Sequence, residues 1–90
     1  MLTIKPGSRF RRDLKTCDKR GLPMKRLREV MNNLSEGKPL DPIFKDHPLK
    51  GDMKGYRECH VYPDWLFIYA VDETNLYAAR TGSHADIYGL

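Results

Sequence analysis

The feature that most constrains the fold is a run of seven consecutive apolar residues, WLFIYAV, at positions 65–71. The run is too short to span a bilayer, which takes about 20 residues. It predicts a central strand that is covered on at least one face. The segment YRECHV at 56–61 alternates in polarity, and LYAARTG at 76–82 follows a turn at 72–75. Three successive strands of this kind predict a β-meander.

The first third of the chain has a helical period. Three apolar residues at the spacing i, i+4, i+7 lie in a helix that Ser8 would cap and Gly21 would end: Phe10, Leu14 and Cys17. A second helix starts near Pro23 and stops at Gly37. Its buried face consists of Met24, Leu27, Val30, Met31 and Leu34. The two helices are expected to form a helical hairpin.

The remaining segments complete the predicted order of elements. Residues 1–5 favour an edge strand, and residues 37–55 favour a long connection rich in proline and glycine. The tail, 83–90, fits a final helical turn or an extended segment. The order is β-α-α-β-β-β, so we expect one α+β domain over residues 1–90. Its helical hairpin would pack on one face of an antiparallel sheet, with Leu76, Ala78 and Arg80 on one face of the last strand.

Charge is distributed unevenly along the chain. Residues 1–30 carry ten basic and three acidic residues, a net charge of +7, whereas residues 31–90 carry −3. Arg11, Lys15 and Lys19 form a basic stripe at helical spacing. A stripe of this kind indicates either a polyanionic or acidic partner or a well-solvated helix face.

The chain shows no sign of export or membrane insertion. Its N-terminus lacks an apolar segment of signal-peptide length, so a cytoplasmic protein is expected. Two cysteines, Cys17 and Cys59, lie in a predicted helix and a predicted strand. Without a C-x-x-C spacing they are expected to be reduced core residues, not a disulfide or half of a zinc site.

Three histidines occur where the predicted sheet brings distant segments together. His60 ends the first strand of the meander and His84 follows the third, and these two ends lie on the same side of the sheet. The side chains expected to gather there are His60, Asp64, Trp65, Arg80 and His84. His47 lies in the long connection and can fold over them.

Such a group suits cleavage of RNA without a metal ion. Imidazole holds or gives a proton near neutral pH, and Asp64 can orient an imidazole. Arg80 presents a planar fork of donors that fits a phosphate gaining charge. Trp65 and Tyr88 offer surfaces on which unpaired bases stack. In this reaction the ribose 2′-OH attacks phosphorus, a base takes its proton, and an acid protonates the leaving 5′-oxygen.

Each residue also has a structural interpretation. His60 can bond to backbone at the end of a strand, and Asp64 is a common turn former. Trp65 can belong to the core, and Arg80 can pair with Glu58 across the sheet. The tail residues can simply cap and pack the C-terminus. Three histidines can also bind zinc, but no tight ligand spacing supports that, so neither a metal nor a cofactor is expected.

Three segments of the chain, FKDHPLKG, KGYRECHVYPDWLFIY and ARTGSHADIYG, resemble signature segments of the RelE superfamily of toxins, specifically its YafQ-like branch. The resemblance covers nearly the whole chain and is most specific in the C-terminal half. It implies a microbial ribonuclease-like fold and an endoribonuclease that cuts messenger RNA, an mRNA interferase, typically in the ribosomal A site. It also implies a cognate antitoxin, through which alone operator DNA would be bound.

By this resemblance His84 is the general acid, and either His47 or His60 is the base, with Asp64 orienting it. Arg80 stabilises the phosphorane. Three further positions are expected to contact RNA: Glu58, Trp65 and Tyr88, the last a tyrosine where the branch often has phenylalanine. The basic stripe of Arg11, Lys15 and Lys19 is expected to contact ribosomal RNA phosphates.

Two alternatives from other classes stay open at this point. The chain can be a RelE-fold relative that has lost cleavage and only pairs with an antitoxin for operator DNA binding. It can also be a ribonuclease with the same chemistry that works without the ribosome.

Overall fold

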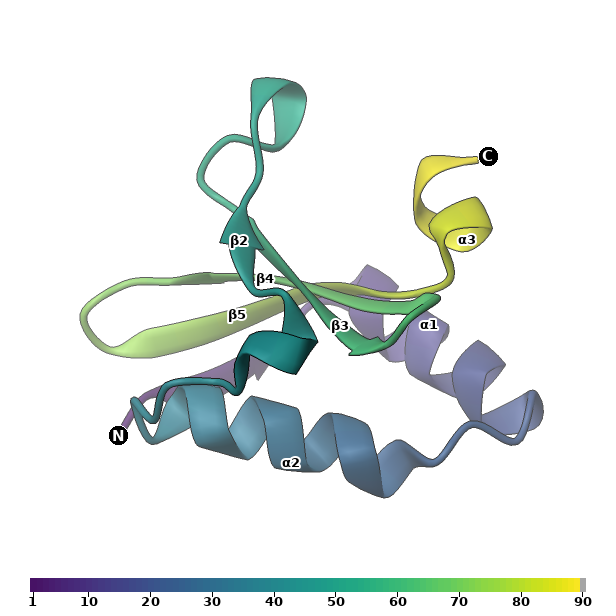
Figure 1. Ribbon diagram of the computed structural model, residues 1–90, viewed down its shortest axis with the longest axis horizontal. Coiled ribbons are helices and arrows are strands. Elements are labelled where there is room, and N and C mark those ends of the chain that lie inside the picture. The colour runs from purple at the N-terminus through teal and green to yellow at the C-terminus, as the bar shows by residue number, and fades with distance from the viewer. Residues whose placement is uncertain (90) are drawn as a thin grey trace.

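The computed structural model describes residues 1–89, which form a five-stranded sheet with helices on both sides (Figure 1). The strands lie in the order β1-β5-β4-β3-β2. The elements are β1 (Thr3–Pro6), α1 (Ser8–Lys19), α2 (Met24–Ser35), β2 (His47–Pro48), β3 (Arg57–Tyr62), β4 (Trp65–Val71), β5 (Asn75–Gly82) and α3 (His84–Tyr88). Two short 3₁₀ turns flank β2: η1 (Pro42–Phe44) and η2 (Gly51–Met53). The predicted α+β class is confirmed.

The apolar run forms the central strand β4, as predicted, and its first five residues are buried. Trp65, Phe67 and Tyr69 belong to the core beneath the helices, where the Phe10 ring of α1 meets Phe67 edge-on at 5.7 Å. The alternate residues Leu66 and Ile68 are also fully buried but face the other side of the sheet. Both faces of β4 are therefore covered, which explains why its sequence does not alternate.

The helical hairpin also forms as predicted. In α1, Phe10 and Cys17 are buried, and α2 buries Leu27 and Val30 against the same core. Gly21, just after α1, has φ +78°, a left-handed conformation that glycine adopts without a steric penalty. Ser8 is the first residue of α1 and not its cap, because Gly7 holds the cap position and no side chain bonds there.

Two features of the sheet differ from the prediction. β1 pairs with β5 in parallel, so the sheet is mixed, not wholly antiparallel. The reason is the hairpin of α1 and α2, which carries the chain away from the sheet before the meander begins. The long connection contains β2, which pairs antiparallel with β3 and sets His47 opposite Glu58. A two-residue strand is too short to show a period in the sequence.

A β-bulge changes the face on which Arg80 lies. The pairing of β4 with β5 shifts by one residue at Ala79, so that Arg80 stands opposite Ile68. The expectation that Leu76, Ala78 and Arg80 share one face is therefore wrong. The extra residue puts Arg80 on the Ile68 side of β5, at the part of the strand that β1 no longer pairs, and from this edge its side chain reaches Asp13 of α1.

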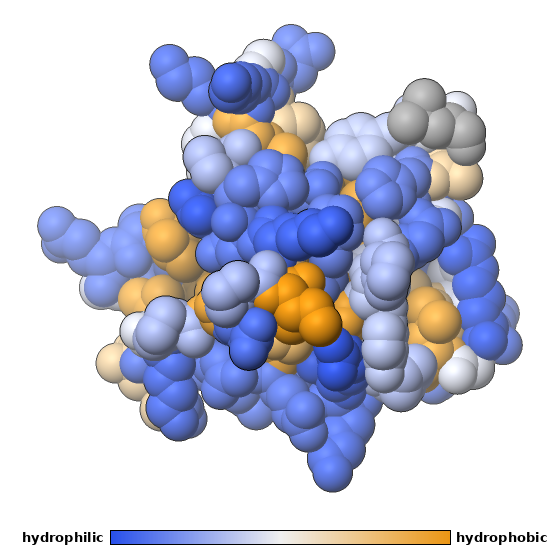
Figure 2. All heavy atoms as spheres, in the orientation of Figure 1, coloured by the Kyte–Doolittle hydropathy of each residue, from blue (hydrophilic) through white to orange (hydrophobic). Residues whose placement is uncertain are grey.

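The remaining features agree with a single core. Cys17 and Cys59 are buried free thiols, as predicted, and burial raises the pKa of Cys59 to about 12. Over residues 1–89, no helix has both the length and the apolar character needed to cross a membrane. Figure 2 shows one face of the molecule as largely hydrophilic, with separate hydrophobic groups between the polar side chains.

Candidate active site

Three imidazoles gather on the sheet face opposite α1 and α2. They come from three elements: His47 from β2, His60 from β3 and His84 from the first turn of α3. The ring centroids of His47 and His60 are 6.3 Å apart, and those of His60 and His84 are 5.9 Å apart. His60 is thus the shared neighbour of the other two rings. The fully buried side chains of Leu66 and Ile68 lie beside this face and form its floor.

A buried carboxylate lies between two of the imidazoles. The side chain of Glu58 is only 7% exposed, and its Oε1 lies 3.4 Å from His60 Nε2 and 3.6 Å from His47 Nε2. Its Oε2 accepts a hydrogen bond from the hydroxyl of Tyr88 on α3. A carboxylate withdrawn from water needs such partners, since an unpaired buried charge is strongly destabilising. Glu58 therefore ties β2, β3 and α3 together at this site.

The hydrogen bonds fix which nitrogen of each ring carries its proton. All three Nδ1 atoms face an acceptor: the Lys45 carbonyl for His47 (2.6 Å), the Pro63 carbonyl for His60 (3.3 Å) and the Asp64 carboxylate for His84 (2.5 Å). A carbonyl or an ionised carboxylate can only accept, so each Nδ1 donates. The Nε2 atom of each ring is therefore the one left to exchange protons or to pair with Glu58.

Asp64 is the partner of His84 and not of the other two histidines. Its Oδ1 accepts from both the backbone N–H of His84, at 2.9 Å, and the Nδ1–H of the ring. The hydrogen bond from the backbone N–H of His84 lowers the pKa of Asp64 most, and the bond from the ring lowers it further. The expectation that Asp64 orients the base, His47 or His60, is wrong. The hairpin between β3 and β4 meets the N-terminus of α3, so its carboxylate reaches the proposed acid instead.

The short helix α3 is held in place by several polar contacts. Ser83 and Asp86 form a capping box at its N-terminus. Arg20, just after α1, donates two hydrogen bonds to Asp86, at 2.5 and 2.9 Å. The hydrogen bonds from Arg20 lower the pKa of Asp86 most, and those from Ser83 lower it further. The position of His84 therefore depends on contacts made outside the imidazole cluster.

Arg80 lies beside α3, but most of its donors are engaged. Its Nε donates to Asp13 of α1 at 2.7 Å, and Nη2 donates to Asp13 and to the Asp86 carbonyl, each at 3.4 Å. The alternative pairing of Arg80 with Glu58 does not form. Within residues 1–89, Nη1 has no protein acceptor, so one terminal nitrogen of this 17%-exposed side chain is left for a ligand.

Trp65 is a core residue. It is 2% exposed, and its indole N–H donates to the hydroxyl of Thr81 at 2.8 Å. The expectation that Trp65 stacks on an RNA base is wrong, and the alternative interpretation as core is correct. As the first residue of β4 it points to the helix side of the sheet. The exposed ring next to it is Tyr62, which stacks on Trp65 with 6.2 Å between centroids.

Tyr88 lies at the open side of the cluster. The residue is 40% exposed, and its ring centroid is 6.4 Å from that of His84. Partial burial, with the bond to Glu58, raises the pKa of Tyr88 to about 12, so the phenol keeps its proton at neutral pH. Its role as a surface for a base stays a prediction.

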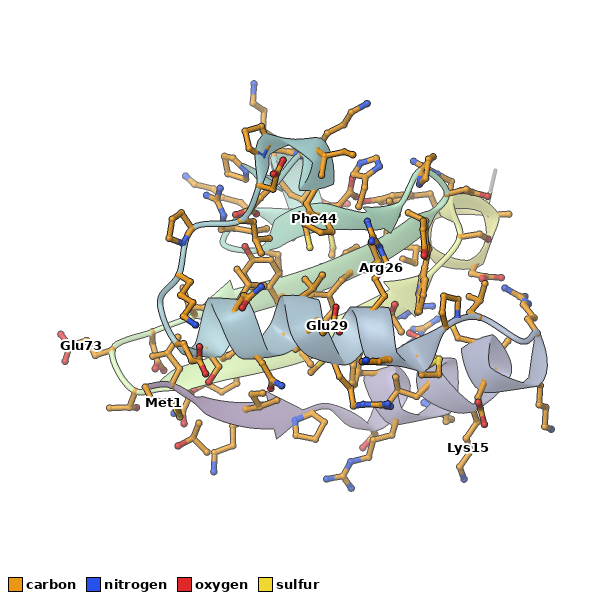
Figure 3. All side chains as sticks on the ribbon, turned by 60° about the horizontal axis from the view of Figure 1, so that its bottom comes forward. Met1, Lys15, Arg26, Glu29, Phe44 and Glu73 are labelled. Atoms are coloured by element: carbon orange, nitrogen blue, oxygen red, sulfur yellow. The ribbon has the colours of Figure 1, made fainter. Side chains whose placement is uncertain are left out.

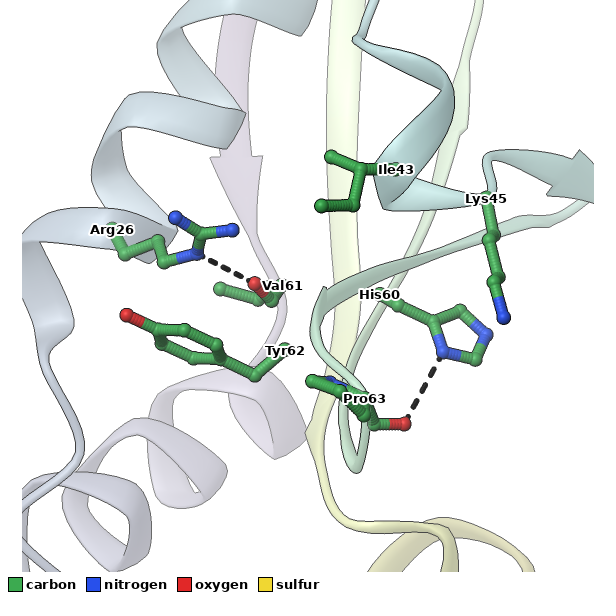
Figure 4. Close-up of a pocket in the computed structure, with 7 residues that line it drawn as sticks. All are labelled: Arg26, Ile43, Lys45, His60, Val61, Tyr62 and Pro63. Atoms are coloured by element: carbon green, nitrogen blue, oxygen red, sulfur yellow. Dashed lines mark hydrogen bonds between the residues drawn. The ribbon is translucent and has the colours of Figure 1, made fainter.

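Basic side chains occur both beside the imidazoles and on a separate part of the surface. Lys45, which sequence reasoning missed, has a left-handed backbone with φ +51° and directs its amine toward His60 (Figure 4). Its place inside the segment FKDHPLKG is the only signal in the sequence. The stripe of Arg11, Lys15 and Lys19 is exposed on α1, where Lys15 projects away from the body of the protein (Figure 3). The stripe is thus separate from the imidazoles.

Among residues 1–89, no group of three or more histidine, cysteine, aspartate and glutamate side chains is arranged to hold a metal ion. What the arrangement offers is proton transfer. It contains a free Nε2 on His84, two imidazoles beside a buried carboxylate, and cations at Lys45 and Arg80. Such a set can act on a phosphodiester.

Comparisons with known proteins point to one group. Residues 2–89 match the family described as "Bacterial toxin of type II toxin-antitoxin system, YafQ". The mRNA interferase toxin YafQ of Escherichia coli K12 is 40% identical over 87 residues, which cover 96% of this chain and 95% of that protein. The E. coli DinJ-YafQ toxin-antitoxin complex contains a chain that is 39% identical, with 98% of both chains covered and a TM-score of 0.90. A metal-bound toxin from Helicobacter pylori is 45% identical over 97% of this chain and 99% of its own, with a TM-score of 0.91.

Proposed function

The chain belongs to the YafQ family of bacterial toxins of type II toxin–antitoxin systems, and we propose that its imidazole cluster is where it cleaves messenger RNA. It is an mRNA interferase, an endoribonuclease. The observation that carries the assignment of the site is the convergence of His47, His60 and His84 from separate elements, each with Nδ1 already bonded. Rings held in this way present Nε2 without further ordering, which suits acid–base catalysis.

His84 is the general acid in this proposal. Asp64 holds its Nδ1–H, so the ring can carry a second proton on Nε2 and give it to the leaving 5′-oxygen. His84 is 42% exposed at the side chain, which leaves it accessible to RNA. Asp64 fixes the tautomer and the orientation of the ring, as a carboxylate does beside a catalytic histidine in other enzymes.

His47 is the general base. Both His47 and His60 face Glu58, but His60 is closer, at 3.4 Å, and only 17% exposed at its side chain. His60 is therefore the better partner for the buried carboxylate. His47 is 46% exposed and 3.6 Å away, so its Nε2 can accept the proton of the 2′-OH. The scissile phosphate would then lie over His60, with acid and base on its two sides.

The reaction balances with these groups alone. A bond forms between the 2′-oxygen and phosphorus while the bond from phosphorus to the 5′-oxygen breaks. The 2′-OH proton goes to His47, and the 5′-oxygen takes a proton from His84. The products carry a 2′,3′-cyclic phosphate and a 5′-hydroxyl. Lys45 and the free Nη1 of Arg80 stabilise the added negative charge on the phosphorane.

The ribosome and an antitoxin are the proposed partners. The exposed stripe of Arg11, Lys15 and Lys19 fits contact with ribosomal RNA phosphates, so that the chain acts in the cytoplasm on messenger RNA being translated. The E. coli YafQ chain forms a complex with DinJ, and we expect a protein of that kind to neutralise this chain. Operator DNA would be reached only through the antitoxin.

A defined cleavage assay tests this function. Purified protein is mixed with messenger RNA, either free or bound in translating ribosomes, and the RNA ends are identified. The expected result is cleavage on the ribosome, with 5′-hydroxyl and 2′,3′-cyclic phosphate ends. Equal rates of cleavage for free and ribosome-bound RNA would show that the ribosome is not required. Phosphate at the new 5′ ends would exclude attack by the 2′-OH.

The metal-bound relative from H. pylori sets a necessary control. The assay is repeated with a chelator that binds copper and zinc but leaves the magnesium of the ribosome in place, and again after adding back copper or zinc. The acid–base proposal expects the chelator to leave the rate unchanged. A rate that falls with chelator and returns with metal would contradict metal-independent cleavage.

A further inference from the structure

A cavity of about 430 Å³ opens beside the imidazole cluster. It lies between η1, α2 and the hairpin that joins β3 to β4 (Figure 4). Its size falls within the range of about 300–1,000 Å³ that is usual for small-ligand sites. Its walls are largely apolar, with Ile43, Tyr62 and Pro63 among them, and His60 and Lys45 stand at one side. A nucleotide joined to a phosphate at His60 can therefore enter this cavity directly.

The opposite side of the cavity is formed by Arg26. This residue reaches from α2 toward Phe44 of η1 (Figure 3), and its Nε donates to the Val61 carbonyl at 2.7 Å. Its guanidinium carbon lies 4.3 Å from the ring centroid of Tyr62 and 5.1 Å from that of Phe44. Two aromatic rings and one hydrogen bond thus hold the guanidinium in a single orientation.

The edge of this guanidinium is free. Among residues 1–89, neither terminal nitrogen of Arg26 has a hydrogen-bond acceptor, and neither is part of an ion pair. Because aromatic rings already pack on the guanidinium, a ligand would meet its hydrogen-bonding edge rather than its flat face. Two parallel N–H donors at the end of an apolar slot match a planar group that carries two adjacent acceptors.

We propose that the cavity binds a guanine base of the RNA next to the scissile phosphate, with Arg26 donating to its O6 and N7. This inference rests on the proposed ribonuclease function and gives the site a base preference. Guanine presents two adjacent acceptors on this edge, whereas adenine presents an acceptor and a donor. The lining contains no acidic side chain that could accept from an adenine or cytosine amino group. A phosphate alone would leave the apolar walls of Ile43 and Tyr62 without a partner.

Tyr62 forms one wall of the cavity, and its position is fixed by its neighbours. Its ring stacks on buried Trp65, and that stacking holds Tyr62 at the cavity wall while keeping it 42% exposed. Ile43 lies across the cavity and is 67% exposed. Trp65 and Arg26 occupy the two faces of the Tyr62 ring, so a flat base in the cavity would cover Ile43 and the exposed edge of that ring.

The test compares Arg26→Lys with Arg28→Lys, an exposed site on the same helix outside the cavity. Both changes keep the charge and remove a planar fork. RNA 5′ ends are mapped after brief expression of each protein. The native protein and Arg28→Lys should show guanine enriched at one fixed position beside the cut. Arg26→Lys should lose that enrichment about tenfold or more while still cutting RNA, because a flexible ammonium lacks the planar fork, fixed between two rings, that fits O6 and N7 together.

A binding experiment covers the case in which Arg26→Lys does not fold. Native protein is titrated with short RNAs that contain guanosine or 7-deazaguanosine, which lacks N7. Affinity should fall about tenfold with the modified base. Equal affinity for the two RNAs, or cuts without base preference that still depend on His84, would overturn the guanine site and leave the ribonuclease function intact. If no RNA cut made by the native protein depends on His84, the proposed ribonuclease function itself is contradicted.

Discussion

The proton on each imidazole is placed by one neighbouring acceptor, and that choice decides what each ring can do. For His84 the acceptor is a carboxylate, whereas His47 and His60 donate to backbone carbonyls. A carboxylate stabilises a charged imidazole more than a carbonyl does. His47 and His60 also face a carboxylate, that of Glu58, but at Nε2. Among residues 1–89, only His84 combines a carboxylate at Nδ1 with an Nε2 that no protein group faces, and this difference is the physical basis for assigning the acid to His84.

Replacement of His84 by alanine should lower cleavage by about 10²- to 10⁴-fold, the usual range for loss of a general acid. The side chain is 42% exposed, so the variant should keep its fold. Single-turnover cleavage on programmed ribosomes measures the rate, and thermal unfolding serves as the control. A cleavage rate within a few-fold of the native rate would show that His84 is not the general acid.

Replacement of Asp64 by asparagine should lower kcat and leave KM nearly unchanged, because in the proposed mechanism the residue acts on RNA only through its contact with His84. The folded protein lowers the pKa of Asp64, so its ionised form contributes stability above the ordinary value near 3.8. That contribution is lost as pH falls through the lowered value. Urea unfolding at pH 7 and pH 3 should therefore show a smaller pH dependence in the variant. An unchanged pH dependence would contradict the contact.

At the scale of single residues, the sequence predicts which side chains come together, but it does not predict the face of the sheet toward which each side chain points. The pattern places His60, Asp64 and His84 at one edge of the sheet, and they do meet there. It cannot place Trp65, because an uninterrupted apolar run hides which side chains face the helices. Arg26 is also missed, since a charged residue on an amphipathic helix looks like any solvated position.

Among the elements, α3 matters most, because a helix of five residues carries the proposed acid. Its own hydrogen bonds cannot stabilise so short a helix. The capping box and the link from Arg20 to Asp86 therefore supply its stability. This arrangement connects the end of α1 to the active site through a single side chain.

Replacement of Asp86 by alanine should weaken α3 by about 1–2 kcal/mol, through loss of the cap and of a partly exposed ion pair. Amide hydrogen exchange in α3 should speed up, and cleavage should fall although all three histidines are present. Asp18→Ala removes an exposed carboxylate from α1 and serves as the matched control. Native exchange rates in α3 of the Asp86 variant would contradict this role.

The elements that sequence reasoning missed share a cause. The strand β2 has two residues, and the bulge at Ala79 adds one residue to β5. Both depend on pairing with a neighbouring strand, which leaves no period in the sequence itself. The longer elements, α1, α2 and β4, are predicted well because each has enough residues to show its repeat.

At the scale of the whole molecule, the basic stripe of α1 and the imidazole cluster lie on different faces. The net charge is +4, and the stripe on α1 lies on the side of the sheet away from the histidines. A chain arranged in this way can contact a large RNA with one face while a messenger strand meets the other. The sequence predicts the charge asymmetry correctly, but only the packing of α1 shows that the two surfaces are separate.

Reversal of Arg11, Lys15 and Lys19 to glutamate should weaken ribosome association and make it less sensitive to salt, because fewer phosphates are neutralised. Reversal of Lys5, Lys25 and Lys38, three exposed residues outside α1, gives the same net charge and serves as the control. Co-sedimentation with ribosomes at several salt concentrations measures both effects. Equal loss in the two variants would mean that overall charge, not this stripe, drives association. Antitoxin neutralisation of both variants shows whether the stripe also serves that partner.

The most direct test of the central claim is a map of RNA 5′ ends after brief expression of the native protein and of His84→Ala. The account predicts growth arrest with cuts in messenger RNA that keep a constant phase relative to the codons, and neither in the variant. Arrest that persists in His84→Ala and in Arg80→Ala, without new RNA ends, would show that the chain acts by binding and would contradict cleavage at this site.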